Sequence, residues 1–244
     1  KMIYVMSDIH GYYSKFKTML KKIKFTDNDY LYILGDVIDR GPQPIPLLID
    51  IMSRENITLL MGNHELMFYE AYNYPNSKNT ATWLRNGGEI TAYQFEQLSG
   101  NDKTDILKYI YSLPVVLTNI QVNDKYYYFA HAGLINHKNI RKKENLASLN
   151  RKDLIDSVWD RSYPYLNINK HPAYEELKNH IFICGHTPTF FLYVKENPAI
   201  TPGHIFYCNK RHYINVDCGC AFIKSGRNGR LGCLCLNTGE EYYA

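Results

Sequence analysis

Aspartate, histidine and asparagine stand beside glycine in five short segments of the sequence. These segments are SDIHG (7–11), GDVIDRG (35–41), GNHE (62–65), HAG (131–133) and GHTPT (185–189). Short Asp, Asn and His side chains supply the oxygen and imidazole nitrogen donors that bind divalent cations, and glycine lets the backbone approach a ligand closely. Because no thiolate is among these donors, they favour Mn, Fe or Zn over a structural zinc held by cysteines.

The donors are sufficient for two cations bridged by one carboxylate, that of Asp36. The ligands predicted for the first cation are Asp8 and His10, and those predicted for the second are Asn63, His131 and His186. Two cations about 3.5 to 4 Å apart can clamp the attacking and leaving oxygens of an in-line displacement, and water between them ionises near neutral pH. The donor set therefore predicts hydrolysis of a phosphate ester.

Each of these segments follows an apolar run that is typical of a strand. The runs are Ile3–Ser7, Tyr30–Leu34, Ile57–Met61, Tyr126–Ala130 and Ile181–Cys184. Apolar residues at helical spacing over Tyr13–Ile23 and Pro44–Glu55 separate the first three runs, which predicts an α/β fold. Because the carboxyl ends of the strands share one edge in such a fold, we expect the five segments to converge there.

The last part of the chain has the pattern of an antiparallel meander. Apolar runs at 205–208, 213–216 and 231–236 are accompanied by turn residues at Asn209–Lys210 and Asn237–Gly239. The six cysteines contain no C-x-x-C pair, and Cys218/Cys220 and Cys233/Cys235 are each spaced by two. On a strand this spacing puts both members on one face, so we expect buried, reduced thiols.

Length and charge limit the classes of protein that fit this chain. Its 244 residues are enough for one sizeable domain, and we expect residues 1–244 to form a single one. A net charge of +4 is too weak to indicate nucleic acid or a membrane surface as a partner. There is no apolar run of about 18 residues and no signal-peptide pattern, so we expect an intracellular, cytoplasmic protein. Lys1 stands before Met2, which indicates Met2 as the natural start.

Taken in order, the five segments resemble the signature of the phosphoprotein phosphatases within the calcineurin-like metallophosphoesterases, especially their bacterial and phage branch. The similarity extends to WLRNGG (83–88), WDR (159–161) and VDCGCAF (216–222). It implies a β-sandwich of mixed sheets flanked by helices, with a dinuclear metal site at the C-terminal edge of the strands. Ser7 stands where the family has glycine, a position that shapes the backbone and supplies no ligand.

The resemblance also implies a role for each matching residue. It assigns the six donors above to the metals, makes His64 the general acid that protonates the leaving oxygen, and makes Asp39 the carboxylate that orients His64. Arg40 and Arg161 match two arginines that grip the phosphate. These roles suit the side chains, because an imidazolium donates a proton near neutral pH and a guanidinium binds phosphate oxygens in pairs.

The resulting expectation is a metal-dependent protein serine/threonine phosphatase with two divalent ions, manganese first and iron or zinc as alternatives. Phosphorylated proteins and peptides, including phosphotyrosine, and small phosphate esters in vitro are the expected substrates. Two alternatives stay open: a symmetrical diadenosine tetraphosphate hydrolase, which shares the motif set, and an inactive phosphate-binding module. Trp83 and the NGG segment (86–88) fit a core aromatic and a simple turn as well as they fit a functional role.

Overall fold

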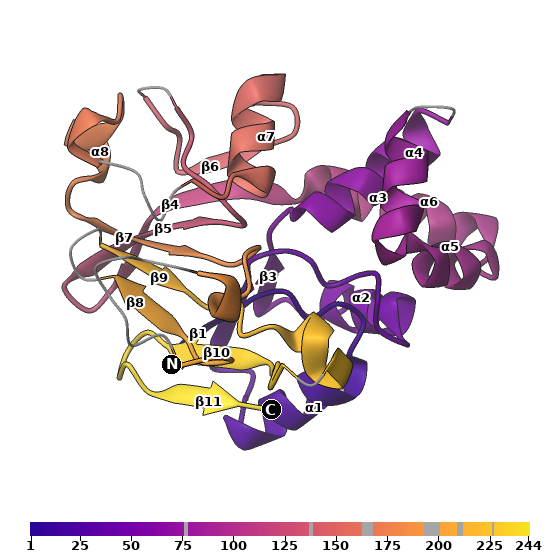
Figure 1. The fold of residues 1–244 in the computed structure, drawn as a ribbon, viewed down its shortest axis with the longest axis horizontal. Coiled ribbons are helices and arrows are strands. Elements are labelled where there is room, and N and C mark those ends of the chain that lie inside the picture. The colour runs from indigo at the N-terminus through magenta and orange to yellow at the C-terminus, as the bar shows by residue number, and fades with distance from the viewer. Residues whose placement is uncertain (76–77, 137–138, 163–167, 193–200, 209–211, 226) are drawn as a thin grey trace.

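The chain forms two mixed β-sheets that pack face to face, with helices around them (Figure 1). The structure is a computed structural model, and it describes residues 1–244 apart from 76–77, 137–138, 163–167, 193–200, 209–211 and 226. This architecture confirms the α/β sandwich of mixed sheets flanked by helices that the sequence predicts.

The first sheet has five strands in the order β11-β10-β1-β2-β3. Its strands are β1 (Ile3–Met6), β2 (Tyr30–Ile33), β3 (Ile57–Leu59), β10 (Gly232–Cys235) and β11 (Glu241–Tyr243). β1, β2 and β3 run parallel, whereas β10 runs antiparallel to both of its neighbours. The predicted first three strands are therefore confirmed, with ends that differ by one or two residues.

The second sheet has six strands in the order β6-β4-β5-β7-β9-β8. Its strands are β4 (Pro114–Val122), β5 (Lys125–Ala130), β6 (Lys143–Asn145), β7 (His180–Cys184), β8 (Phe206–Cys208) and β9 (Tyr213–Asn215). β5, β7 and β9 run parallel, and the other pairs are antiparallel. Each sheet thus contains three adjacent parallel strands.

An apolar core fills the space between the two sheets. Val5 of β1, Phe129 of β5 and Ile183 of β7 meet in this core and are fully buried. Their neighbours Tyr4 and Tyr128 point the opposite way, into the larger core beneath the helices. This alternation follows from the two-residue period of a strand, and burying each such side chain stabilises the fold by about 1.5–3 kcal/mol.

Helices connect the parallel strands and extend the fold on one side. They are α1 (Tyr13–Lys22), α2 (Pro44–Met52), α3 (Asn63–Asn73), α4 (Lys78–Trp83), α5 (Glu89–Glu96), α6 (Gly100–Ser112), α7 (Arg151–Trp159) and α8 (Tyr174–Leu177). α1 and α2 follow β1 and β2, as the helical spacing predicts. α3 to α6 form a group between β3 and β4, on the right in Figure 1. No helix in the described ranges is long and apolar enough to cross a membrane.

The predicted C-terminal meander is wrong. β8 and β9 form a hairpin in the second sheet, whereas β10 and β11 form a hairpin in the first. The connection between β9 and β10 is too long for a tight turn, and it carries the chain across from one sheet to the other. The predicted turn at 237–239 is confirmed by a positive φ of 78° at Gly239, and the one at 209–210 lies outside the described residues.

All six cysteines are free and buried, which confirms the prediction of core thiols. Cys233 and Cys235 lie on the same face of β10, in the core beneath the helices. Cys218 and Cys220 follow β9 instead of lying within it, and they face different cores. The expectation that both pairs share one face of a strand is therefore wrong for this second pair, because the chain leaves the sheet there.

Candidate metal centre

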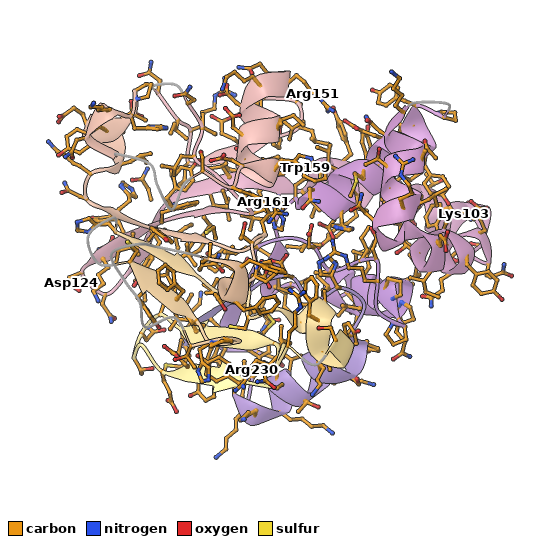
Figure 2. All side chains as sticks on the ribbon, in the orientation of Figure 1. Lys103, Asp124, Arg151, Trp159, Arg161 and Arg230 are labelled. Carbon is orange, nitrogen blue, oxygen red and sulfur yellow. The ribbon has the colours of Figure 1, made fainter. Side chains whose placement is uncertain are left out.

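The predicted site residues come together where the parallel strands of both sheets end. Five loops, those after β1, β2, β3, β5 and β7, carry nine of the ten predicted side chains. The tenth, Arg161, follows α7, and Figure 2 shows it near Trp159 toward the middle of the molecule. The predicted convergence of the five segments is thus present, because the parallel strands bring these loops to one edge.

A cavity of about 120 Å³ lies at this edge. Seven of the ten predicted residues line it: Asp8, His10, Asp36, Arg40, Asn63, Arg161 and His186. The remaining three, Asp39, His64 and His131, are buried behind this layer. The predicted residues therefore form an inner layer in contact with the cavity and an outer layer that supports it.

Backbone strain is concentrated in the same loops. Twelve non-glycine residues of the described chain have a positive φ, and six of them are predicted site residues: Asp8, His10, Asp36, Asp39, Arg40 and His186. Such conformations cost energy in residues with a Cβ, and they persist only where the surrounding structure enforces them. The fold thus holds these side chains in directions that an unstrained loop would not give.

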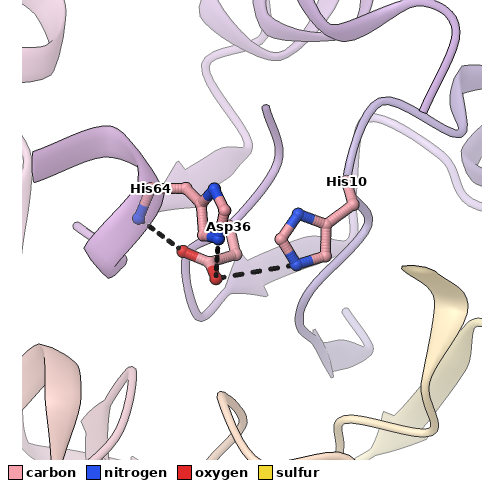
Figure 3. A group of neighbouring side chains, drawn as sticks. All are labelled: His10, Asp36 and His64. Atoms are coloured by element: carbon pink, nitrogen blue, oxygen red, sulfur yellow. Dashed lines mark hydrogen bonds and ion pairs between the residues drawn. The ribbon is translucent and has the colours of Figure 1, made fainter. Parts of the chain in front are cut away.

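The carboxylate of Asp36 lies at the centre of the site (Figure 3). Its Oδ2 is 3.7 Å from Nε2 of His10, 3.9 Å from Nε2 of His64 and 3.4 Å from Nε2 of His131. Its Oδ1 accepts a hydrogen bond of 3.0 Å from the backbone N–H of His64. A carboxylate surrounded in this way could bridge two ions, as the sequence predicts for Asp36.

Hydrogen bonds fix which nitrogen of two histidines is free. Nδ1 of His10 lies 3.0 Å from the carbonyl oxygen of Ile38, and Nδ1 of His131 lies 2.6 Å from that of Leu34. A carbonyl oxygen only accepts, so both Nδ1 atoms carry a proton. In the neutral rings Nε2 is then left with a lone pair, which is the arrangement by which proteins orient histidine ligands of metals.

The acceptor atoms around His131 point at one another. In the neutral ring, Nε2 of His131 presents its lone pair to Oδ1 of Asn63 at 2.9 Å and to Oδ2 of Asp36 at 3.4 Å. Nearby, Nε2 of His186 is buried without a hydrogen-bond partner among the described residues. Acceptor atoms this close together repel one another unless a cation or an added proton lies between them. These residues could therefore hold a metal ion.

The charges of the site lead to the same conclusion. Although burial opposes the effect, the carboxylates of Asp36 and Asp8 raise the pKa of His131 to about 10. Burial, assisted by nearby positive groups, lowers the pKa of His10 and of His186 well below the usual value. The negative site therefore attracts positive charge, while two of the predicted ligands stay neutral and free to bind a metal.

His64 and Asp39 form the contact predicted for a general acid and its orienting carboxylate. Nδ1 of His64 donates to Oδ2 of Asp39 at 2.5 Å. Thr91 Oγ1 donates to the other oxygen of Asp39 at 2.5 Å, and Trp83 Nε1 donates to Oδ2 at 2.9 Å. The sequence pattern does not indicate Thr91, which lies in α5 outside the predicted segments. Trp83 begins WLRNGG, but a tryptophan there fits a core aromatic equally well.

The two predicted arginines lie at the cavity. Nη1 of Arg40 donates to Nε2 of His10, and Nη2 donates to Nε2 of His64, each at 3.0 Å. The NGG segment holds this arginine, since Gly87 accepts from its backbone N–H at 3.0 Å. Arg161 donates to Oγ1 of Thr187 at 3.0 Å. Arg40 lines the cavity and His64 does not, so the guanidinium of Arg40 separates the imidazole of His64 from the cavity.

Glu65 is the supporting residue that the sequence analysis overlooked. Its Oε2 accepts from the backbone N–H of Asp36 at 2.8 Å and of Gly62 at 3.0 Å, and its Oε1 accepts from Val37 at 2.9 Å. Burial and the charge of Asp36 raise the pKa of Glu65 to about 7, although the hydrogen bonds from the backbone N–H groups act to lower it. The capping pattern of GNHE was a signal that could have identified Glu65, because its carboxylate also caps the first turn of α3.

The fold and the site together define the class of metallophosphoesterases: a two-sheet sandwich with histidine and aspartate clusters where its parallel strands end. Residues 1–213 match the model of the calcineurin-like phosphoesterases, and the chain belongs to this family of hydrolases. The fold is shared with a protein serine/threonine phosphatase from Saccharomyces cerevisiae, at a TM-score of 0.63 and 16% identity over 98% of this chain and 73% of that one. A cold-active protein tyrosine phosphatase gives a TM-score of 0.58 and 20% identity, over 100% of this chain and 78% of that one.

Related sequences carry two different names. A symmetrical bis(5'-nucleosyl)-tetraphosphatase of Wigglesworthia glossinidia brevipalpis is 28% identical over 83% of this chain and 76% of its own length. One of Buchnera aphidicola is 43% identical, over 29% of this chain and only 26% of its own length. Serine/threonine-protein phosphatase 2 of Escherichia coli is 31% identical over 53% of this chain and 57% of its own length. The chain therefore matches only part of the length of these relatives.

The hydrogen bonds of Glu65 lead to a first prediction. Glu65→Ala leaves four buried N–H groups without this acceptor, so we expect the free energy of unfolding of the metal-free protein to fall by roughly 3 kcal/mol. Urea denaturation followed by circular dichroism measures this loss. Glu96→Ala is the matched control, because that carboxylate is half-exposed on α5 and its removal is expected to cost under about 1 kcal/mol. Equal losses in the two variants would contradict the role given to Glu65.

Proposed function

We propose that this chain is a metal-dependent protein serine/threonine phosphatase that hydrolyses phosphate monoesters and also accepts phosphotyrosine. One observation carries the proposal: a single small cavity is lined by five of the six predicted metal ligands, from both sets, and by both predicted phosphate-binding arginines. The metal-binding and phosphate-binding groups that the sequence predicts therefore face the same space.

The metal ions belong to the proposal through the donor set. Asp8 and His10 would hold one divalent ion, Asn63, His131 and His186 a second, and Asp36 would contact both. Manganese fits these oxygen and nitrogen donors, as do iron and zinc. When bound, the ions would neutralise phosphate charge and make water a nucleophile at neutral pH.

Arg40 and Arg161 would orient the phosphoryl group from the rim of the cavity. Arg40 is exposed, and its two Nη atoms donate to imidazole nitrogens. A phosphate oxygen is a stronger acceptor than a neutral imidazole, because the hydrogen bond is then charge-assisted at both ends. Phosphate binding would draw the guanidinium from the rings into the cavity and would uncover His64.

His64 would supply the proton to the leaving oxygen. Its Nδ1 is held by Asp39, which leaves Nε2 facing Arg40 and the cavity beyond it. Although burial works against it, the charges of Asp36 and Asp39 raise the pKa of His64 above its usual value. Once the guanidinium of Arg40 has moved to the phosphate, Nε2 of His64 would be free to take up the proton that a general acid needs near neutral pH.

The second candidate is symmetrical hydrolysis of a dinucleoside tetraphosphate, which the names of two relatives favour. That substrate has two nucleosides joined by four phosphates, so most of it would lie outside a cavity of about 120 Å³. In either substrate, the phosphoryl group at the cleaved bond is the part that would enter the cavity.

The proposed ligands predict a loss of metal when the bridging carboxylate is changed. Protein stripped with a chelator and reloaded with manganese is expected to bind two ions per chain, and Asp36→Asn is expected to bind fewer than one. Mass spectrometry of the metal content after dialysis measures this. Asp50→Asn on α2 is the matched control and should keep both ions, since Asp50 pairs with Arg54 on the surface. Two ions retained by Asp36→Asn would exclude the bridge.

The acid role of His64 predicts a different pattern. His64→Asn is expected to lower kcat on a phosphoserine peptide by roughly a hundred- to ten-thousand-fold, with the metal content unchanged. The loss should be much smaller for an ester whose leaving group needs no proton, such as nitrophenyl phosphate. His204→Asn, which lies against Tyr243 away from the cavity, is the control and should retain full activity. A similar loss on both esters would remove His64 from proton transfer.

Product analysis separates the two candidate substrates. The manganese-loaded protein is expected to release inorganic phosphate from a phosphoserine peptide with a higher kcat/KM than it shows on diadenosine tetraphosphate. Chromatography of nucleotides and a phosphate assay on the same preparation measure both reactions. Release of ADP from the dinucleotide at the higher kcat/KM would replace the proposed function by the second candidate.

A further inference from the structure

Part of the lining of the cavity is aromatic, and Phe191 and Phe222 form one wall of it. Trp159, Phe191 and Phe222 line it, in the same space as Arg40 and Arg161. Trp159 stands at the end of α7 and meets the ring of His186 edge to face, with 5.9 Å between the ring centroids. The proposed phosphate site therefore has charged groups and flat apolar surfaces within one small volume.

Phe191 is exposed to an extent that packing does not explain. Half of the surface of this residue (50%) is accessible to solvent. Among the described residues, only six large hydrophobic residues are exposed to solvent. The other five, Ile49, Tyr74, Tyr93, Tyr111 and Tyr126, do not line the cavity. Leaving an aromatic ring in water forgoes its burial energy, so an exposed ring in a binding cavity indicates a ligand surface.

The ring of Phe191 is held by its neighbours. Phe190, one residue earlier, packs so closely on Gly219 that a Cβ there would lie 2.3 Å from its Cε1 atom. Phe222 meets Phe190 at right angles at 5.3 Å and Phe191 at 81° and 5.8 Å between centroids. The backbone N–H of Phe191 donates to Pro188 at 2.8 Å. Phe190 anchors the pair, and Phe191 is presented to the cavity.

Arg227 adds a positive charge to this wall. Its Cζ lies 5.0 Å from the centroid of the Phe191 ring, a cation–π distance, and the side chain is exposed. The contact limits the movement of the ring without burying it. A ligand at this wall would meet an oriented aromatic ring together with a cation that favours an anionic substrate.

We propose that Phe191, Phe222 and Trp159 form a subsite for the ring of an aryl phosphate, so that phosphotyrosine is accepted beside phosphoserine through ring contacts that phosphoserine cannot make. The proposal rests on the proposed function, since the ring is placed by a phosphoryl group bound at Arg40 and Arg161. In an aryl phosphate the ring begins one bridging oxygen from phosphorus, so it would lie next to the residues that line the same cavity. Rings at a centroid distance of 4.5–7 Å attract one another, and the aromatic wall is built at this spacing.

Other groups attached to the phosphate would make weaker contacts with these aromatic rings. A serine or threonine ester places only sp³ carbons next to the bridging oxygen, and these atoms offer little area to a flat ring. A nucleotide base is separated from its phosphate by a ribose, which puts the base beyond a cavity of about 120 Å³. The aromatic wall therefore discriminates by the group that is attached directly to the phosphate.

The kinetic test uses two peptides of the same sequence, one with phosphotyrosine and one with phosphoserine. Phe191→Ala is expected to lower kcat/KM on the phosphotyrosine peptide by about 3- to 10-fold and to leave the phosphoserine value within about 2-fold. Phe191→Leu keeps apolar volume without a ring and should show the same selective loss. Tyr93→Ala on α5, which is 67% exposed away from the cavity, is the control and should change neither value.

A binding test is independent of turnover. Calorimetry of the manganese-loaded protein with phenylphosphonate and methylphosphonate is expected to show tighter binding of the phenyl compound, by about 3- to 10-fold. Phe191→Ala should abolish this difference and keep the affinity for methylphosphonate. Retained affinity for methylphosphonate also shows that the variant is folded.

The outcomes separate the two proposals. Equal binding of both phosphonates by the unchanged protein, or equal losses on both peptides in Phe191→Ala, would overturn the aryl subsite. If neither peptide is hydrolysed but phenylphosphonate binds more tightly in a manner that depends on Phe191, the proposed phosphatase function fails and the subsite stands.

Discussion

The hydrogen bonds from four backbone N–H groups to Glu65 are the contact on which the rest of the site depends. They tie the loop after β2 to the start of α3, and so place Asp36 against Gly62. A Cβ at Gly62 would lie 2.2 Å from Oδ1 of Asp36, so only glycine permits this approach. With the loop held, the left-handed conformation of Asp36 is enforced, and its carboxylate is directed between the histidines.

The site also links the two sheets. Nδ1 of His131, at the end of β5, donates to the carbonyl oxygen of Leu34, at the end of β2 in the other sheet. Asp8, after β1, accepts from the backbone N–H of His186, after β7. The hydrogen bonds that orient the predicted ligands are therefore the same ones that join the sheets beyond the apolar core. A shift of one sheet against the other would misplace both ion sites together.

Sequence patterns predicted the parts of this arrangement that depend on local order. Strand periodicity and Gly-flanked Asp and His placed nine of the ten residues in loops that do converge. Two kinds of contact do not appear as periodicity in the sequence. Glu65 binds backbone groups of another loop, and Thr91 reaches Asp39 from an inserted helix. The tail was predicted wrongly for a related reason: strand pattern does not tell which sheet a strand joins, because both sheets offer an antiparallel edge.

The relation between strain and charge explains why such a site suits a metal enzyme. Asp8, His10 and Asp36 occupy costly backbone conformations, and the acceptors of Asn63 and His131 face each other at 2.9 Å. Without a metal, a proton on His131 satisfies these acceptors, since the charges of Asp36 and Asp8 raise the pKa of His131 to about 10. A metal ion that replaces this proton would find the same acceptors already in place, and the side chains would need little rearrangement. The cost of preorganisation is therefore borne during folding, which leaves the cavity complementary to a cation.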